Sequence, residues 1–487
     1  MYWREHDGTL TIKYAAKIAG KGGIKMNDLQ RAVGLTDNPI QTELLYKEKV
    51  GDYLLVCKPL NMDGVILLDS ELANVYNLCN GLNDIKTIID ITKIAKERVI
   101  QIITALWDAN YLQIKGKVLD STSDSIQSVP SNIDTWFHIT NSCNLDCPYC
   151  YINKTKGSMT WDTAKQAIDA LTETAVLEKR PGVMIKLAGG EPLLKFPLIK
   201  RVVEYGKQHG EKYGIKNQFH LITNGTLITQ GVIEFLKRND VKISISLDGI
   251  GAYNDQQRFY PNQKGSFETV DKGMRMLREQ GITPFVLITV TSHSLAGLPD
   301  FTHYLLKNNI GFRYSLYRGS DNRDPKNVNP KEAIKILNQC YDLFEQNLPK
   351  NDLMSFHQFC DIKFTKKRKR NCGIGSNGII IGHKGQVAIC QILLDQPIGD
   401  ISKDINLLKM IKNQNQFNAK DHTVDDKLEC KNCLWRYICS GGCPLLTKDA
   451  YGSYDMSSPY CEVFQAIIPR LIRIIGLQII AKSRHML

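Results

Sequence analysis

Six apolar strand segments alternate with helical segments between residues 134 and 317, and this alternation restricts the possible folds more than any other feature. Helical stretches separate the strands, for example over 160–178, opened by Thr160, and over 266–280, opened by Ser266. Strands separated by helices pair in parallel. The pattern predicts an α/β fold with a parallel sheet, open or curled into part of a barrel. Ligands should gather at the C-terminal ends of its strands. The segments read TWFHIT, VMIKLAGG, FHLITNG, VKISISLDG, TPFVLITVT and GFRYSLY.

The chain has 487 residues, too many for one hydrophobic core of ordinary size. Before the barrel segment, two short strands around NMDG and three helical stretches are typical of a winged-helix-like module. After about residue 360 the strand–helix alternation stops and cysteines dominate. The predicted division is 1–42, N-terminal extension; 43–117, winged-helix-like domain; 118–132, linker; 133–320, partial barrel; 321–359, helical connection; 360–465, cysteine-rich domain; and 466–487, C-terminal amphipathic helix.

No secretory signal and no stretch of eighteen uninterrupted apolar residues is visible, so we expect a cytoplasmic protein without a membrane partner. The apolar C-terminal segment, interrupted by Arg470, Arg473 and Lys482, predicts a docked amphipathic helix, with membrane contact as an alternative. The net charge is +12, and KKRKR at 366–370 is either a solvated loop or a contact for an anionic partner.

Ten of the fourteen cysteines fall into two ordered groups. In a cytoplasmic chain this favours metal binding over disulfides. The first group, NSCNLDCPYC, holds Cys143, Cys147 and Cys150 directly after the first barrel strand. A closed metal site uses four ligands. A trio without a nearby fourth cysteine therefore predicts a centre with one open coordination position.

This trio, with Tyr149 before the last cysteine, resembles the signature of the radical S-adenosylmethionine (SAM) enzymes. The resemblance implies a partial (β/α)6 barrel and a [4Fe–4S] cluster on Cys143, Cys147 and Cys150, whose fourth iron binds SAM through its amino and carboxylate groups. It also implies reductive cleavage of SAM to a 5′-deoxyadenosyl radical that abstracts a hydrogen atom from the substrate.

Three further strand-end motifs match the family's cofactor-binding segments. GGEP (Gly189, Gly190, Glu191) resembles the segment that contacts the SAM amino group, and TNGT with Asn224 resembles one that lines the nucleoside. SLDG resembles another lining segment, and the SAM contacts that the resemblance implies there are Ser246, for the ribose, and Asp248. Arg258 is a candidate partner of the SAM carboxylate, with a surface salt bridge as the alternative. Each motif alone is also typical of an ordinary turn at a strand end.

The second cysteine group resembles the SPASM extension, which in its family carries two auxiliary [4Fe–4S] clusters. By position, one cluster takes Cys430, Cys433, Cys439 and Cys461, and the other takes Cys372, Cys390 and Cys443. Cys360 either completes the second set or leaves it open. Zinc is the rival ion, although the five residues between Cys433 and Cys439 are fewer than in a zinc ribbon. We therefore expect three [4Fe–4S] clusters and SAM as cofactors.

Residues 43–117 resemble the PqqD-like peptide-recognition element of enzymes that mature ribosomal peptides. In that family the leader of the precursor peptide adds as a strand to an exposed sheet edge. A DNA-binding winged helix and a packing domain without a ligand are the alternatives.

The combined prediction is a radical SAM oxidoreductase that modifies a ribosomally synthesised precursor peptide, forming a thioether or carbon–carbon crosslink. Its partners would be the precursor, bound through its leader, and a flavodoxin- or ferredoxin-type electron donor, with no nucleic acid. One alternative is a sulfatase-maturase-like oxidation of Cys or Ser to formylglycine. The other is a non-catalytic zinc protein that binds nucleic acid.

Overall fold

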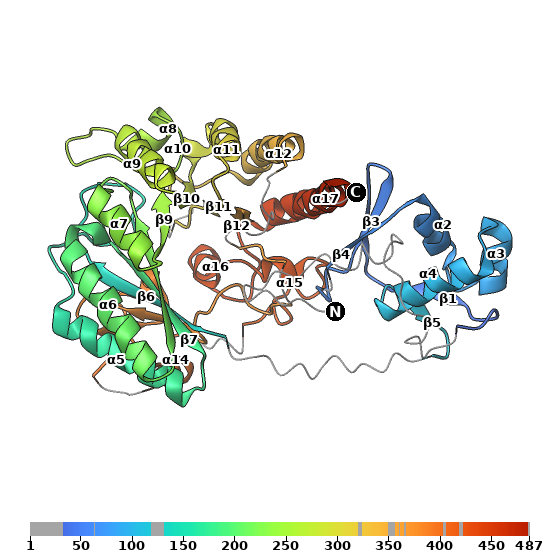
Figure 1. Ribbon diagram of the computed structural model, residues 1–487, viewed down its shortest axis with the longest axis horizontal. Helices are drawn as coiled ribbons and strands as arrows, with labels where there is room; N and C mark the ends of the chain where they lie inside the picture. Colours follow the sequence, from blue (N-terminus) through green and yellow to red (C-terminus); the bar gives the residue numbers. More distant parts are fainter. Residues whose placement is uncertain are drawn as a thin grey trace.

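The computed structural model describes residues 33–62, 64–117, 131–319, 324–348, 356–359, 361–364, 367–402, 406–417 and 422–485. Its N-terminal module contains an antiparallel sheet in the order β2-β3-β4, followed by three helices, and a separate pairing of β1 with β5. β1 and β2 are additions to the predicted elements. The module, blue in Figure 1, consists of β1 (Pro39–Gln41), β2 (Tyr46–Val50), β3 (Tyr53–Cys57), β4 (Val65–Leu68), α2 (Ser70–Leu78), α3 (Ile85–Thr92), α4 (Lys96–Asp108) and β5 (Leu112–Ile114).

Both faces of the β2-β3-β4 sheet are covered. Val56 and Ile66 pack in one core with helices α2, α3 and α4. Leu55 and Leu67, which point to the opposite face, belong to the large core that contains the C-terminal helix. A Cβ on Gly476 of that helix would lie 2.6 Å from Leu55 Cδ1, so the glycine permits the close approach. The module is therefore docked onto the rest of the chain through its sheet.

The predicted parallel sheet is present. It runs in the order β12-β11-β10-β9-β8-β7-β6-β13-β14-β15, and β6 to β12 pair in parallel. Burial alternates along most of its strands, as expected when one side packs under helices. The six predicted strands are β6 (Ile133–Thr140), β7 (Gly182–Gly189), β8 (Lys216–Thr223), β9 (Lys242–Ser246), β10 (Phe285–Val290) and β11 (Phe312–Leu316).

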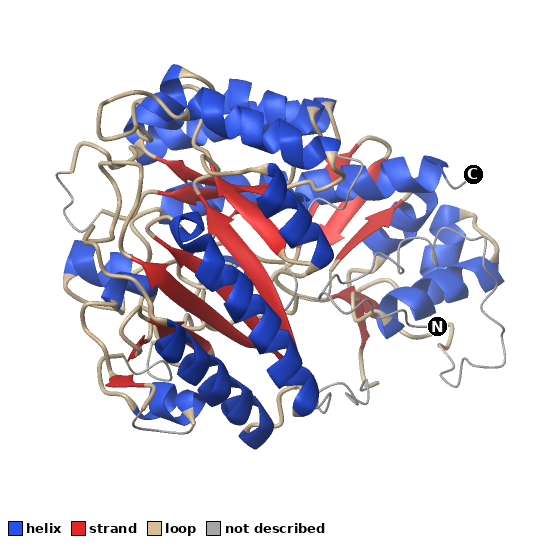
Figure 2. Ribbon diagram, turned by 60° about the vertical axis from the view of Figure 1, so that its left-hand side comes forward, coloured by secondary structure: helices blue, strands red, loops and turns tan. Residues whose placement is uncertain are grey.

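Helices lie along the outside of these strands (Figure 2). Thr160 caps α5 as predicted, since its hydroxyl accepts from Thr163 N at 3.1 Å. Ser266 precedes α9 but donates instead to Arg258 O at 2.7 Å. The helices are α5 (Trp161–Leu177), η2 (Pro192–Lys195), α6 (Phe196–Lys212), α7 (Gln230–Arg238), α8 (Ala252–Asp255), α9 (Phe267–Glu279), α10 (Ser292–Leu295), α11 (Leu298–Lys307) and α12 (Pro330–Gln346).

The sheet extends beyond the six predicted strands at both edges. β12 (His357–Phe359) follows α12 and pairs with β11, inside the segment expected to be a helical connection. β13 (Gly378–Ile381) pairs with the outer edge of β6, and β14 (Gln386–Ala388) and β15 (Gly399–Asp400) continue antiparallel. The cysteine-rich region therefore shares a sheet with the barrel.

The C-terminal helix α17 (Cys461–His485) contacts α12 and all three strands of the N-terminal sheet. Its segment Cys461–Lys482 is long and apolar enough to cross a membrane by length and composition, but 61% of its most apolar window is buried inside the protein. This burial agrees with the docked helix that the sequence predicted. The remaining elements are η3 (Gln391–Leu393), α14 (Leu407–Asn413), α15 (Arg436–Cys439) and α16 (Pro444–Tyr451).

Candidate active site

Cys143, Cys147 and Cys150 lie on the loop after β6, and each is partly exposed. Burial of the sulfur raises the pKa of Cys147 to about 11, the Arg258 charge opposes this rise, and the thiols of Cys143 and Cys150 add to it. Burial likewise raises the pKa of Cys143, and Cys150 contributes there too. The three sulfurs are thus close enough to influence one another, as the spacing predicted.

The cysteine trio offers thiolates of the kind that hold an iron–sulfur cluster. In a [4Fe–4S] cluster each thiolate binds a different iron, so the sulfurs surround a wider space than the ligands of a tetrahedral zinc, which lie about 2.0–2.3 Å from one atom. Within the residues that the structure describes, no group of three His, Cys, Asp or Glu side chains is placed to hold one metal ion. Three neighbouring thiols fit a cluster that takes one thiolate per iron.

The GGEP turn presses against the start of the cysteine loop. Gly189 has φ +135, and a Cβ there would lie 2.5 Å from Thr140 O; at Gly190 it would lie 2.2 Å from Ser142 O. Gly190 N donates to Thr140 O at 2.7 Å and Glu191 N to Ser142 O at 2.8 Å. Both glycines therefore allow close packing of two backbone segments of this chain.

Glu191 is fully buried and already accepts three hydrogen bonds from the protein. Its carboxylate accepts from Leu193 N at 2.9 Å, Thr223 Oγ1 at 2.7 Å and Asn224 N at 2.8 Å. Burial raises the pKa of Glu191 to about 7, and these hydrogen bonds oppose the rise. Glu191 thus joins the GGEP and TNGT turns, and its predicted contact with the SAM ammonium stays a prediction.

Asn224 links TNGT to the cysteine loop. Its Nδ2 donates to Asn144 Oδ1 at 2.8 Å and lies 3.8 Å from Cys143 Sγ. Ser246, at the end of β9, makes no side-chain hydrogen bond within the described part of the chain. Asn224 therefore fixes the loop that carries the trio, whereas the hydroxyl of Ser246 is available to a ligand.

Asp248 accepts hydrogen bonds from three residues near the cysteine loop. Tyr149 Oη donates at 2.5 Å, Arg258 Nε at 2.8 Å and Thr289 N at 2.8 Å. The exposed fraction of Asp248 is 0% and that of Arg258 is 8%, so this is a buried ion pair. Arg258 also lies over the Tyr149 ring, 5.4 Å from its centroid. Of the two roles considered for Arg258, the structure shows the ion pair. This pair is buried, whereas the sequence suggested a salt bridge at the surface.

Cys372, Cys390 and Cys443 form the first auxiliary group. Burial raises the pKa of Cys390 to about 11; Cys443 adds to the rise and Arg318 opposes it. The pKa of Cys372 is raised by burial and, further, by Cys443 and Cys390. The three thiols are therefore neighbours. Cys360, their predicted fourth partner, lies outside the described residues.

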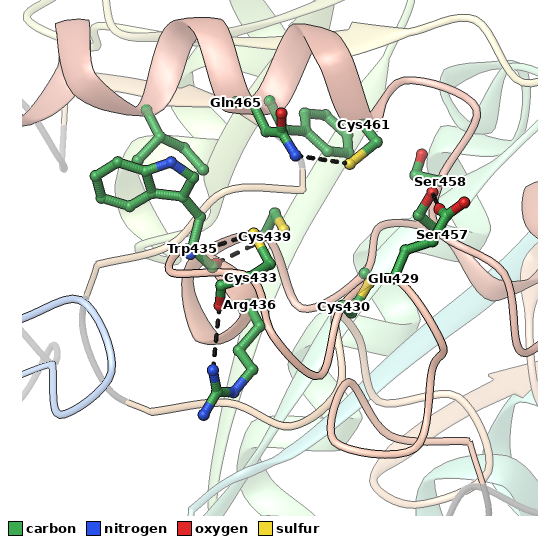
Figure 3. A pocket seen from close by; sticks show the side chains of 13 residues that line it. Glu429, Cys430, Cys433, Trp435, Arg436, Cys439, Ser457, Ser458, Cys461 and Gln465 are labelled. Atoms are coloured by element: carbon green, nitrogen blue, oxygen red, sulfur yellow. Dashed lines mark hydrogen bonds between the residues drawn. The ribbon is translucent and has the colours of Figure 1, made fainter. Parts of the chain in front are cut away.

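Cys430, Cys433, Cys439 and Cys461 line one cavity of about 180 Å³. Figure 3 shows their sulfurs around it, with Cys461 projecting from the first turn of α17. Burial raises the pKa of Cys430 to about 11, and Cys461 and Cys433 add to this. The sequence assigned the same four residues to one cluster.

The turn between Cys439 and Cys443 explains how these cysteines serve different groups. Ser440, Gly441 and Gly442 all have positive φ, at 51°, 72° and 71°. Three consecutive left-handed residues reverse the chain, and two of them are glycines because other side chains are strained there. The reversal directs Cys439 into the four-cysteine cavity and Cys443 towards Cys372 and Cys390.

Two residues near the thiols were not singled out by the sequence. Burial raises the pKa of Cys443, and Arg318, just after β11, opposes this rise; Arg318 also forms an ion pair with the buried Asp361 at 2.9 Å. Burial raises the pKa of the Tyr151 hydroxyl, and Cys150 and Cys390 both add to this rise. Tyr151 therefore lies close to one cysteine of the catalytic trio and one of the auxiliary group. Its position directly after the last cysteine of the trio was the available signal.

Comparison with known proteins agrees with this geometry. The Radical SAM superfamily model matches residues 137–303. The chain is 34% identical over 240 residues to an uncharacterized protein of Methanocaldococcus jannaschii, covering 46% of this chain and 81% of that protein. It is 23% identical over 349 residues to the cysteine-type anaerobic sulfatase-maturating enzyme of Clostridium novyi, covering 68% and 93%.

Solved structures show the same fold. Native anSMEcpe with bound AdoMet has a TM-score of 0.60 at 20% identity and covers 71% of this chain and 99% of its own. Streptococcus suis SuiB bound to its precursor peptide SuiA has a TM-score of 0.51 at 16% identity and covers 87% and 99%. The family match lies on the strands and the cysteine trio described above. The chain therefore belongs to the radical SAM superfamily and is an enzyme.

Proposed function

We propose that this enzyme matures a ribosomally synthesised peptide by forming a thioether or carbon–carbon crosslink. The observation that carries the proposal is a combination within one chain: a radical SAM barrel, two further groups of cysteines, and an N-terminal module with an exposed strand edge. SuiB bound to a precursor peptide covers 87% of this chain, and anSMEcpe covers 71%. The larger coverage favours a relative whose substrate is a precursor peptide.

Cys143, Cys147 and Cys150 would hold the catalytic [4Fe–4S] cluster, which with SAM supplies a 5′-deoxyadenosyl radical when reduced by a flavodoxin- or ferredoxin-type donor. The chain's own contribution is positioning. Asp248 and Asn224 fix the cysteine loop through Tyr149, Asn144 and Arg258, and Ser246 offers a hydroxyl for the ribose.

The other cysteines would hold two auxiliary clusters. The four-cysteine cavity provides a complete ligand set for one. Cys372, Cys390 and Cys443 would hold the other, with Cys360 or a substrate thiolate as the fourth ligand. Tyr151 lies close to Cys150 and Cys390, so a peptide bound beside Tyr151 would be near both groups.

We further propose that residues 43–117 act as a PqqD-like element and that the leader peptide pairs with the outer edge of β2. No other strand in the described residues pairs with this edge. Lys47 and Lys49 are exposed along it, and Arg473 Nη1 donates to Lys49 O at 3.2 Å, which marks that carbonyl as pointing away from β3. Residues two apart in a strand share this orientation, so Lys47 also offers its N–H and C=O to an added strand.

The test is leader binding to the full chain, using the N-terminal half of a candidate precursor chosen from short open reading frames near the gene. An extended peptide on a sheet edge should bind in the micromolar range, about −8 kcal/mol. Lys47→Pro removes an outward N–H without breaking the β2–β3 ladder and should weaken binding about tenfold or more. The matched control Lys47→Ala keeps the N–H and should bind normally. Equal affinity for both variants would refute strand addition at β2.

Formylglycine formation is the second candidate, because the alignment with this chain covers 93% of the Clostridium novyi sulfatase-maturating enzyme. The products distinguish the two reactions. A crosslink removes two hydrogens and creates no carbonyl, whereas formylglycine is an aldehyde that reacts with hydrazides. A hydrazide-reactive product from the cognate peptide would transfer the assignment to this candidate.

A further inference from the structure

The interior face of the barrel is accessible and polar. Along β7, β8, β10 and β11 fully buried residues alternate with partly exposed ones. The buried set points outward under the helices: a Cβ on Gly206 of α6 would lie 2.6 Å from the Phe219 ring. The partly exposed set therefore faces the interior. It comprises the polar side chains of Lys186, Gln218, His220, Thr289, Arg313 and Ser315 and the apolar side chains of Met184, Ile222, Phe285 and Leu287.

Arg313 is the unusual member of this set. Its Nε is buried without a hydrogen-bond partner. Within the described ranges its guanidinium has neither a hydrogen bond nor an ion pair, whereas Lys186 pairs with Asp134 at 2.7 Å. A guanidinium in a partly dehydrated site is costly unless an anion accompanies it. Its donors form a planar fork that matches a carboxylate.

The surroundings of Arg313 carry excess positive charge. His220 lies beside Lys186 and Lys242 in the strand register. Burial lowers the pKa of His220 to about 4, and Lys186, Lys242 and Arg313 lower it further, while Asp134 opposes them. Around His220, the three cations Lys186, Lys242 and Arg313 thus outnumber the single carboxylate, Asp134. Trp136, which is paired in register with Lys186, adds a buried indole N–H without a partner.

Resting on the proposed function, we propose that Arg313 recognises a carboxylate of the substrate peptide inside the barrel. Lys242 supplies further positive potential, and the Trp136 N–H is a second unmatched donor. The substrate class is then a peptide that places an acidic side chain, or its own C-terminal carboxylate, near the reacting residue.

Arg313 lies on a different strand from the motifs expected to contact SAM. Gly189 ends β7 and Ser246 ends β9, whereas Arg313 lies on β11, three residues before its end at Leu316. Through Leu287 it is in register with Ser246, two strand spacings or about 10 Å away across the sheet. The guanidinium therefore faces the barrel interior beside the expected cofactor, where a substrate would insert.

The test measures binding of blocked five-residue glycine peptides to the native chain by calorimetry. One carries a central glutamate, one a central glutamine, and one an unblocked C-terminal carboxylate. We expect the glutamate peptide to bind about tenfold to a hundredfold tighter than the glutamine peptide. Preference for the third peptide instead would assign the terminal carboxylate as the ligand.

Arg313→Gln should abolish the preference for a carboxylate. Arg313→Lys retains the charge without the planar fork and should keep part of the preference for a carboxylate. This conservative variant also tests the inference if Arg313→Gln fails to fold. The control Arg275→Gln, whose side chain is 63% exposed, should behave as the native chain. A native chain without the preference, or a preference that survives in Arg313→Gln, would overturn the inference.

Formation of 5′-deoxyadenosine and modification of the cognate peptide are measured separately. An enzyme that modifies a peptide but ignores carboxylates contradicts only the role of Arg313. An enzyme that prefers carboxylates but modifies no peptide contradicts only the proposed function.

Discussion

Asp248 shows how single buried residues position the cysteine loop. It accepts from Tyr149, which lies between Cys147 and Cys150, and from Arg258, which follows the next helix. The spacing of the cysteines was sufficient to predict the trio. The partners of Glu191 and Arg258 were not predictable, because Thr223 reaches Glu191 only when β7 and β8 pair, and Asp248 reaches Arg258 only when the chain folds back after α8.

Asp248→Asn should destabilise the cluster-free protein. The substitution leaves Arg258 buried without its counter-charge, which costs about 3 to 5 kcal/mol. The measurement is the free energy of urea unfolding at neutral pH. Asp52→Asn, in the exposed turn after β2, should change it by no more than about 0.5 kcal/mol. Similar values for both variants would show that the ion pair does not hold the loop.

Cys360 decides whether the first auxiliary cluster is closed. If it is the fourth ligand, Cys360→Ala should lose that cluster, and iron content should fall by about four atoms per chain. Cys340→Ala, in the buried face of α12, is the control and should keep all its iron. An unchanged iron content in Cys360→Ala would instead favour direct binding of a substrate thiolate.

At the scale of elements, the barrel strands and most helices were predictable because their periodicity is strong. β12 and β13 were not, since each has only three or four residues and gains its stability from an existing strand edge. The exposed edge of β2 was likewise not predictable, because it depends on α17 covering one face of the β2-β3-β4 sheet and leaving that edge unpaired. The family match leaves no support for the alternative of a non-catalytic zinc protein.

β12 brings a neutral histidine into an aromatic cluster. Burial lowers the pKa of His357 to about 3 from its ordinary 6.5. Between these values the unfolded chain binds a proton that the folded chain excludes, so stability is lost as pH falls from 6.5 towards 3, by at most about 1.4 kcal/mol per pH unit. His357→Gln should flatten this slope in urea unfolding measured from pH 7 to 4. His293→Gln, at an exposed position, should leave it unchanged; equal slopes in both variants would contradict the account.

At the scale of the whole molecule, α17 links two parts of the chain: it contributes Cys461 to the four-cysteine cavity and docks the N-terminal module. A leader on β2 would lie near the four-cysteine cavity, because Tyr46 contacts Trp435, with ring centroids 5.3 Å apart, and Trp435 lines that cavity. Docking across distant segments was not predictable from local sequence pattern, since it depends on the match between two surfaces.

The most direct test is the iron content of the anaerobically reconstituted native chain and of a variant with Cys143, Cys147 and Cys150 all replaced by Ala. Three clusters predict about twelve irons per native chain and about eight in the variant. About four irons in the native chain together with stoichiometric zinc, or an iron content that the triple substitution does not reduce, would contradict the assignment of the three sites.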